Sequence, residues 1–204
     1  LSIACVEKMK HIISIIILSL VLFSCAKEES DDSATTELEG TWVTSCNVYS
    51  DSLYRKLTTV VSGTNFTVNY EYFSDSSCTT AASKWVDTQT SLSIGDAMVF
   101  STYGASGGSG HQFTVYHNST TAEWQNASDV SWANTNSYCG ETDWELNVAQ
   151  DVSGKTCGSS TEWSSGITIY GLYILDGNKF MPSYDEDSYP SSVSSADSNT
   201  FIKQ

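Results

Sequence analysis

Alternation of apolar and polar side chains along residues 66–73 is the feature that most constrains how this chain folds. Phe66, Val68, Tyr70 and Tyr72 occupy every second position of Phe-Thr-Val-Asn-Tyr-Glu-Tyr-Phe. A period of two places these side chains on one face of a strand, whereas an amphipathic helix requires a period near 3.6. The segment therefore predicts a half-buried β-strand.

The neighbouring sequence extends the β pattern. Residues 53–61 are rich in Thr, Val and Leu, and the turn-forming sequence Ser-Gly-Thr-Asn at 62–65 joins them to residues 66–73, which predicts a hairpin. Asp176-Gly177 marks a second tight hairpin. Further strands are expected at 41–46, 85–92, 97–102, 112–116, 167–175, 179–182 and 199–202. Residues 123–132 are the best helix candidate, although their apolar stripe is poor.

About eight antiparallel strands within residues 38–204 predict a single all-β domain. Two architectures accommodate this number of short strands: an up-and-down barrel and a β-sandwich. A barrel leaves no unpaired strand edge, which suits a long-lived extracellular domain. We therefore expect a barrel and keep the sandwich as the alternative.

The N-terminal segment has the pattern of an export signal. Met9-Lys10-His11 precedes residues 12–23, which are almost wholly apolar. A helix of that length spans roughly 18 Å, too short for the roughly 30 Å of a bilayer core. The apolar run ends in Leu22-Phe23-Ser24-Cys25, which resembles the lipobox of bacterial lipoproteins.

This resemblance implies a membrane anchor. It makes residues 1–24 a cleaved signal peptide and places a diacylglyceryl group on Cys25. Residues 25–37 would then be the lipidated cysteine and a solvated tether, because they lack apolar periodicity. The expected location is the bacterial cell envelope, with the domain outside the cytoplasm. Ala26 replaces the aspartate that marks inner-membrane retention in enterobacteria, which favours the outer membrane.

The charge of the chain limits its partners. The formal net charge is −15, and it becomes −16 when the leader with Glu7, Lys8 and Lys10 is removed. Such a surface repels phosphate backbones, so we expect no nucleic-acid partner. It is also repelled by anionic headgroups, so the lipid on Cys25 has to supply the membrane contact.

Four cysteines remain when Cys5 of the leader and the lipidated cysteine are set aside. An even number in an exported domain predicts two disulfides, for which three pairings exist. We expect Cys46–Cys78 and Cys139–Cys157, because each pair lies within one local block of the chain. The spacing of these cysteines does not fit a zinc site.

Two blocks of sequence resemble known proteins. The segment Leu38-Glu39-Gly40-Thr41-Trp42 is similar to the Gly-x-Trp strand that opens lipocalin-like barrels. The following Cys46 and the tyrosine-rich strand that ends in Asp75-Ser-Ser-Cys78 look like the extracellular domains of the APC-down-regulated (APCDD) family. That likeness implies a lipocalin-like barrel that binds an apolar or lipidated ligand. The arginine that packs on the tryptophan in lipocalins has no counterpart, since Arg55 is the only arginine.

The second block begins at Cys139-Gly-Glu-Thr-Asp-Trp144 and continues through residues 151–155 and 173–179. It looks like an element of uncharacterised bacterial lipoproteins.

Catalytic and metal-binding patterns are weak. His111 and His117 would share one face of a strand, but no third metal ligand accompanies them, and we expect both to be exposed. Glu141, Asp143 and Glu145 would share the face of a strand opposite Trp144, although a solvated loop is favoured. Residues 184–188 could offer Asp185 and Asp187 to a weak Ca²⁺ site, but they lack the EF-hand pattern. We therefore expect no catalytic residues, no metal and no cofactor.

Aromatic residues are the strongest functional signal, with six Trp and eleven Tyr in the chain. We assign Trp42, Tyr70 and Tyr72 to the core. Other aromatic residues lie in polar, Gly- and Ser-rich surroundings, where their rings can contact a ligand: Trp124, Trp132, Tyr138, Trp144 and Trp163.

Three functions compete at this level. The first is a lipid-anchored barrel that binds a small apolar or amphipathic ligand. The second is a structural or adhesive envelope protein with a filled interior, and the third is a secreted hydrolase. A cavity inside the barrel is the feature that separates the first from the second.

Overall fold

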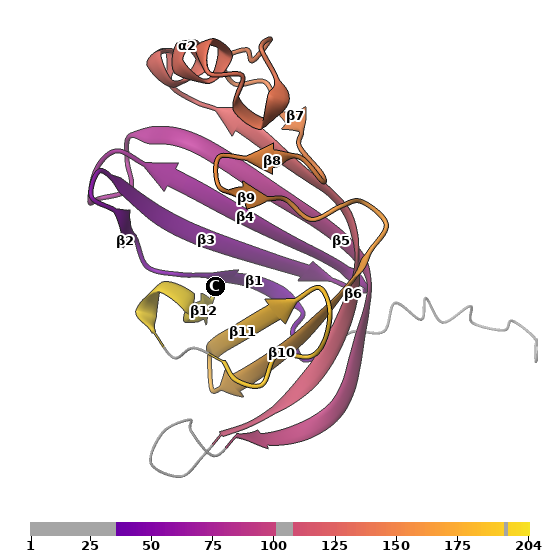
Figure 1. Cartoon of the computed structure of the whole chain (residues 1–204). Helices are drawn as coiled ribbons and strands as arrows, with labels where there is room; N and C mark the ends of the chain where they lie inside the picture. Colours follow the sequence, from indigo (N-terminus) through magenta and orange to yellow (C-terminus); the bar gives the residue numbers. More distant parts are fainter. Residues whose placement is uncertain (1–35, 101–107, 194–195) are drawn as a thin grey trace, which may run out of the picture. The chain divides into compact units, whose positions relative to one another are not determined.

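Eight antiparallel strands of this chain form a closed ring (Figure 1). The computed structural model describes residues 36–100, 108–193 and 196–204. In order around the ring the strands are β1 (Gly40–Val43), β3 (Leu53–Ser62), β4 (Asn65–Phe73), β5 (Ala81–Phe100), β6 (Gly108–Trp124), β10 (Thr168–Asp176), β11 (Lys179–Asp185) and β12 (Phe201–Lys203). The ring closes because β1 pairs with both β12 and β3. The predicted barrel is confirmed, and the sandwich alternative is wrong.

The remaining elements decorate this ring. They are β2 (Asn47–Ser50), α2 (Ala127–Thr135), η1 (Tyr138–Gly140), β7 (Gln150–Asp151), β8 (Thr156–Cys157), β9 (Ser160–Thr161) and η2 (Asp197–Asn199). Figure 1 shows α2, β7, β8 and β9 gathered at one end of the barrel, in the excursion between β6 and β10. We name residues 125–167 the excursion.

The helix begins later than expected, because Glu123 and Trp124 belong to β6. Asn126 caps it by accepting a hydrogen bond from the Ser128 backbone N–H. In the part of the chain that the structure describes, no helix has the length and apolar character needed to cross a membrane.

Strands β5 and β6 are longer than the sequence patterns predict. The segments 85–92 and 97–102 were expected as separate strands, but β5 runs through both as far as Phe100, and residues 101–102 lie outside the described residues. Extra residues in β5 shift its register on β6 between Thr90 and Ser93 and again between Ile94 and Ala97. These bulges interrupt the alternation on which the prediction depended without ending the strand.

One end of the barrel is filled by large side chains. Phe66 and Phe113 stack with ring centroids 5.9 Å apart, and Tyr173 lies 5.9 Å from Phe113. Gly171 faces Phe113 across the β6–β10 pair, and a Cβ at Gly171 would lie 2.1 Å from the Phe113 ring. The absence of a side chain at residue 171 therefore makes room for this ring.

Trp42 is buried where β1 closes the ring. Its indole N–H donates to the Leu38 carbonyl at 2.7 Å, and its ring lies 5.4 Å from that of Phe180. The ammonium of Lys203 lies 5.0 Å above the Trp42 ring. A lysine on the last strand thus contacts the tryptophan on the first.

The chain enters the barrel at the filled end. Glu39 accepts a hydrogen bond from the backbone N–H of Gly63, in the turn between β3 and β4. The Tyr173 hydroxyl donates to the Glu37 carboxylate. The predicted signal peptide, Cys5 and the lipid site Cys25 lie outside the described residues, as does the predicted tether up to residue 35. The described residues form one compact unit.

Both predicted disulfides are present. Cys46 and Cys78 tie the start of β2 to the β4–β5 turn, with their Cα atoms 5.9 Å apart. Asp75 organises this turn, since its carboxylate accepts backbone hydrogen bonds from Ser77, Thr79 and Thr80, and the bond from Thr80 is the main cause that lowers its pKa to about 2. The Asp-Ser-Ser-Cys block is thus a turn that presents Cys78.

Candidate functional site

A cavity of about 380 Å³ lies at the end of the barrel that carries the excursion. It has the size of small-molecule pockets, which occupy roughly 300–1,000 Å³. The residues that form its walls are Tyr49, Leu53, Tyr70, Tyr72, Ser83, Trp85, Asp87, Thr120, Trp124, Tyr138, Cys157, Ser160, Thr161, Glu162 and Trp163. Seven of these fifteen side chains are aromatic. The site is therefore an aromatic pocket with a few polar groups.

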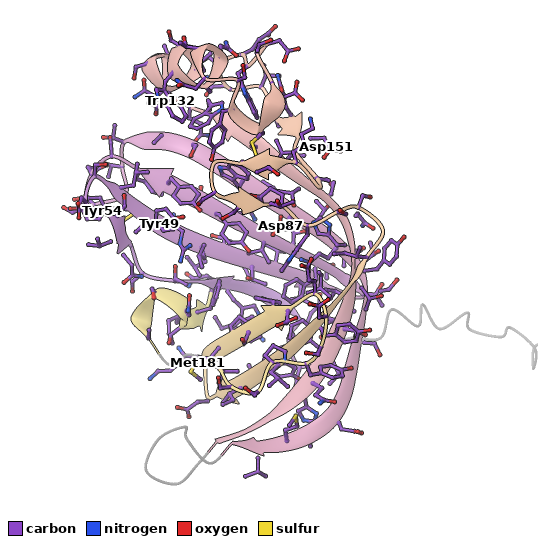
Figure 2. The ribbon with its side chains drawn as sticks, viewed as in Figure 1. Tyr49, Tyr54, Asp87, Trp132, Asp151 and Met181 are labelled. Carbon is purple, nitrogen blue, oxygen red and sulfur yellow. A yellow bond between two sulfur atoms is a disulfide. The ribbon has the colours of Figure 1, made fainter. Side chains whose placement is uncertain are left out.

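Two parts of the chain build the pocket. Strands β4, β5 and β6 supply inward-facing side chains at alternate positions, such as Tyr70 and Tyr72 on β4 and Trp85 and Asp87 on β5. The excursion supplies the opposite wall through Tyr138 and residues 160–163. Figure 2 shows Asp87 on β5 beside the excursion.

The excursion is fixed to the barrel at two points, Val152 and Gly166. The Val152 backbone N–H donates to the Thr120 carbonyl at 2.9 Å, and Gly166 and His117 form a backbone hydrogen bond of the same length. The Cys139–Cys157 disulfide joins η1 to β8, and Cys157 itself lines the pocket. This wall is thus part of the folded domain, because its backbone and its disulfide both hold it.

Three of the five predicted ligand contacts line the pocket: Trp124, Tyr138 and Trp163. Trp132 does not line it; its side chain is 50% exposed, and its ring lies 5.4 Å from that of Tyr138 (Figure 2). Trp144 is 2% exposed and donates its indole N–H to the Tyr138 carbonyl at 3.2 Å. Trp132 and Trp144 therefore support the rings that face the cavity.

Tyr70 packs against the hydrophobic core as expected, and both Tyr70 and Tyr72 also line the cavity. Burial and then the charge of Asp87 raise the pKa of Tyr70 well above its ordinary value. Burial is also the main cause that raises the pKa of Tyr72 to about 12, and that of Tyr138 is raised by burial and then by Glu162. These phenols stay protonated at neutral pH, and all three side chains line the cavity.

His117 was expected to be exposed, but it has no exposed surface. Its Nδ1 lies 3.0 Å from the Ser164 carbonyl oxygen, and its Nε2 lies 3.1 Å from the Thr120 hydroxyl. The Thr120 hydroxyl donates to Asp87 at 2.7 Å, and the carboxylate lies 3.9 Å from Nε2. These contacts join two strands of the barrel to the excursion.

The hydrogen bonds define the protonation state of His117 when Asp87 is ionised. The Ser164 carbonyl can only accept, so Nδ1 carries a proton. Thr120 gives its only proton to Asp87, so its oxygen accepts from Nε2. The ring is therefore an imidazolium. Desolvation lowers its pKa, but the nearby Asp87 carboxylate, the hydrogen bond to the Ser164 carbonyl and the charge of Asp151 raise it above the ordinary value overall.

A bulge in β6 makes this contact possible. Residues three apart on a regular strand face opposite sides, yet both His117 and Thr120 are buried. Asn118 is an extra residue in β6, because Gln89 pairs with His117 while Thr88 pairs with Ser119. The extra residue turns Thr120 and the following inward positions toward the cavity.

Sequence reasoning missed Asp87, Thr120 and Glu162 as site residues. A signal for Asp87 exists, since it shares the inward face of a predicted strand with Trp85 and Gln89. No pattern in the sequence places the Asn118 bulge, which determines the direction of Thr120.

A second cavity of about 260 Å³ meets the first at Tyr70, which lines both. Its other lining residues include Leu57, Val68 and Phe201 from the barrel, and Arg55. Arg55 lies 4.9 Å over the ring of Tyr49. The interior of the barrel is thus divided by Tyr70.

The other candidate sites do not assemble. Glu141, Asp143 and Glu145 lie in an irregular segment and not on a strand; Glu141 pairs with Lys155 at 2.6 Å, and Glu145 is exposed. His111 lies between the Gly95 carbonyl and Glu37, near the filled end of the barrel.

The acidic loop at residues 184–188 and the predicted metal-binding residues do not form a site in the described part of the chain either. Asp185 accepts backbone hydrogen bonds from Asp187 and Ser188, which closes a local turn. Among residues 36–100, 108–193 and 196–204, no three His, Cys, Asp or Glu side chains are grouped so that they could hold a metal ion.

No model of a known protein family matches this chain, and no curated protein is significantly similar to it in sequence.

Proposed function

We propose that this protein is an extracytoplasmic, lipid-anchored binding protein that holds a small amphipathic ligand at the mouth of its barrel. One observation carries the proposal: a cavity of about 380 Å³ whose walls are rich in aromatic side chains. A structural or adhesive protein needs no such cavity, and a filled interior would be the more stable solution.

The ligand would contact both the aromatic and the polar side chains of the cavity wall. The indole and phenol rings offer apolar faces to a hydrocarbon or ring system. Asp87, Glu162 and the tyrosine hydroxyls offer polar contacts that orient one end of the ligand. This combination favours an amphipathic ligand over a purely apolar one.

Hydrolysis is the less supported alternative. Asp87 and Glu162 both line the cavity, and glycosidases use two carboxylates. Asp87, however, accepts a hydrogen bond from Thr120 and lies beside the imidazolium of His117, so it already has partners within the protein. We therefore propose binding without chemistry.

The two disulfides support an oxidising compartment outside the cytoplasm. The lipobox-like sequence before Cys25 supports the anchor. Replacing the cysteine (Cys25→Ser) should release the protein from membranes in a fractionation experiment. A Cys25→Ser protein that stays membrane-bound and keeps its leader would identify residues 12–23 as an uncleaved anchor instead.

Binding is tested by native mass spectrometry on residues 26–204, exported to a periplasm and purified without detergent. A stoichiometric small-molecule adduct, identified after extraction, supports the binding function. The matched control is Ser160→Trp, at an exposed residue that lines the cavity, which we expect to fill part of the cavity and to remove the adduct. An unliganded mass that persists after incubation with an envelope lipid extract would favour the structural alternative.

A further inference from the structure

The cavity has an unbalanced charge. Its walls contain two carboxylates, Asp87 and Glu162, and no lysine or arginine. Asp87 is balanced, because the imidazolium of His117 lies 3.9 Å away and Thr120 donates to the same oxygen. Glu162 therefore decides the net charge that a ligand meets.

Glu162 has no partner of its own in the described part of the chain, since no hydrogen bond or ion pair reaches its carboxylate. The nearest cation along the chain, Lys155, is engaged elsewhere: its ammonium binds Glu141 at 2.6 Å and the Asp151 carbonyl at 2.8 Å. Burial and then the charge of Asp87 raise the pKa of Glu162, and His117 opposes them. A partly buried carboxylate without a counter-charge is costly, and a cation beside it removes that cost.

The rings around Glu162 suit a cation as well. Trp85 and Trp124 contact Tyr138 edge-on, with centroids 6.5 and 5.5 Å away, and all three rings line the cavity. The face of an aromatic ring attracts positive charge, most strongly where water is excluded. Elsewhere the protein already pairs cations with rings, as Lys203 does with Trp42.

We propose that the ligand is an organic cation, an ammonium or quaternary ammonium with an apolar body, whose charge lies between Glu162 and the rings of Trp85, Trp124 and Tyr138. This inference rests on the proposed binding function and specifies its substrate class. A carboxylate ligand would face Glu162 as a like charge. A neutral ligand would leave Glu162 without a counter-charge.

The test compares three amphiphiles of one chain length: decyltrimethylammonium, decanol and decanoate, each below its micellar concentration. Residues 26–204, which contain the whole compact unit, are titrated while tryptophan fluorescence and heat are measured. The cation should bind about tenfold more tightly than either of the others, as expected for a charge partner combined with cation–π contact. If decanol or decanoate binds as tightly, the cation proposal is wrong while the binding function stands. If none binds, the proposed function fails with it.

Glu162→Gln tests the carboxylate directly. This variant keeps the shape of the side chain and removes its charge, so cation affinity should fall about tenfold while decanol affinity stays unchanged. Glu145→Gln is the matched control, because it makes the same change of net charge on an exposed residue outside the cavity. Equal losses in the two variants would assign the effect to net charge and overturn the proposed contact.

Discussion

Lys203 places its ammonium 5.0 Å above the ring of Trp42, across the pair of strands that closes the barrel. Trp42 lies on the first strand of the barrel and Lys203 on the last, so their contact forms only when β12 pairs with β1. The cation covers one face of a buried indole whose N–H is already bonded to the Leu38 carbonyl.

Lys203→Met should therefore destabilise the protein. The variant keeps the apolar stem but removes the charge over the Trp42 ring, which is worth about 0.5–1 kcal/mol. Urea denaturation followed by fluorescence measures the change. Lys179→Met, an exposed lysine on β11, is the control. The contact with Trp42 contributes nothing if the two variants lose the same stability.

The imidazolium of His117 predicts a pH dependence of stability. A pKa raised by folding means that the charged ring stabilises the native state at pH values below its unfolded pKa. That contribution is lost as the pH rises through the folded pKa. The melting temperature should therefore differ most between wild type and His117→Gln near pH 6, and the difference should shrink toward pH 9. His111→Gln is the control, and a constant difference for His117→Gln would refute the imidazolium.

A side chain at residue 171 should destabilise the protein by steric overlap. A methyl group there would overlap the Phe113 ring, because a Cβ on residue 171 would lie 2.1 Å from it, so Gly171→Ala should cost about 1–3 kcal/mol through displacement of the ring. At Gly95 the nearest atom is 3.5 Å from the Cβ position, so Gly95→Ala should change stability by only about half a kcal/mol. Chemical denaturation of both variants checks the contrast, which disappears if Phe113 can move freely.

The Cys139–Cys157 disulfide should matter for binding as well as for stability. Its loss in Cys139→Ser/Cys157→Ser should cost about 3 kcal/mol in the chain-entropy model and loosen the wall that carries Glu162. Decyltrimethylammonium affinity should fall along with the melting temperature. The double variant of Cys46 and Cys78 removes a bridge outside the excursion and should keep more of the affinity at a similar loss of stability. The reverse order would contradict the role given to the excursion.

Much of the barrel was predictable, because its strands alternate between interior and exterior. The hairpin of β3 and β4 and the turn at Asp176-Gly177 follow from local sequence. The length of β5 does not, since its bulges shift apolar residues from one face to the other. The two disulfides were predictable from local spacing alone.

The site was predictable only in part. Trp124, Tyr138 and Trp163 were identified because large aromatic rings in polar, Gly- and Ser-rich segments indicate that the rings contact something, either a ligand or other side chains. Whether such a ring faces a cavity, as Trp163 does, or supports it, as Trp144 does, depends on how the excursion folds back on β6. The partnership of His117 with Asp87 depends on the bulge at Asn118, a feature of backbone geometry.

The entry of the chain beside Glu37 and Glu39 gives the barrel two unlike ends. The first described residues contact the filled end, where Glu39 accepts from Gly63 and Glu37 accepts from Tyr173, while the aromatic cavity lies at the end that carries the excursion. A label attached beside Glu37 would therefore lie at the end opposite the cavity and leave the cavity unobstructed.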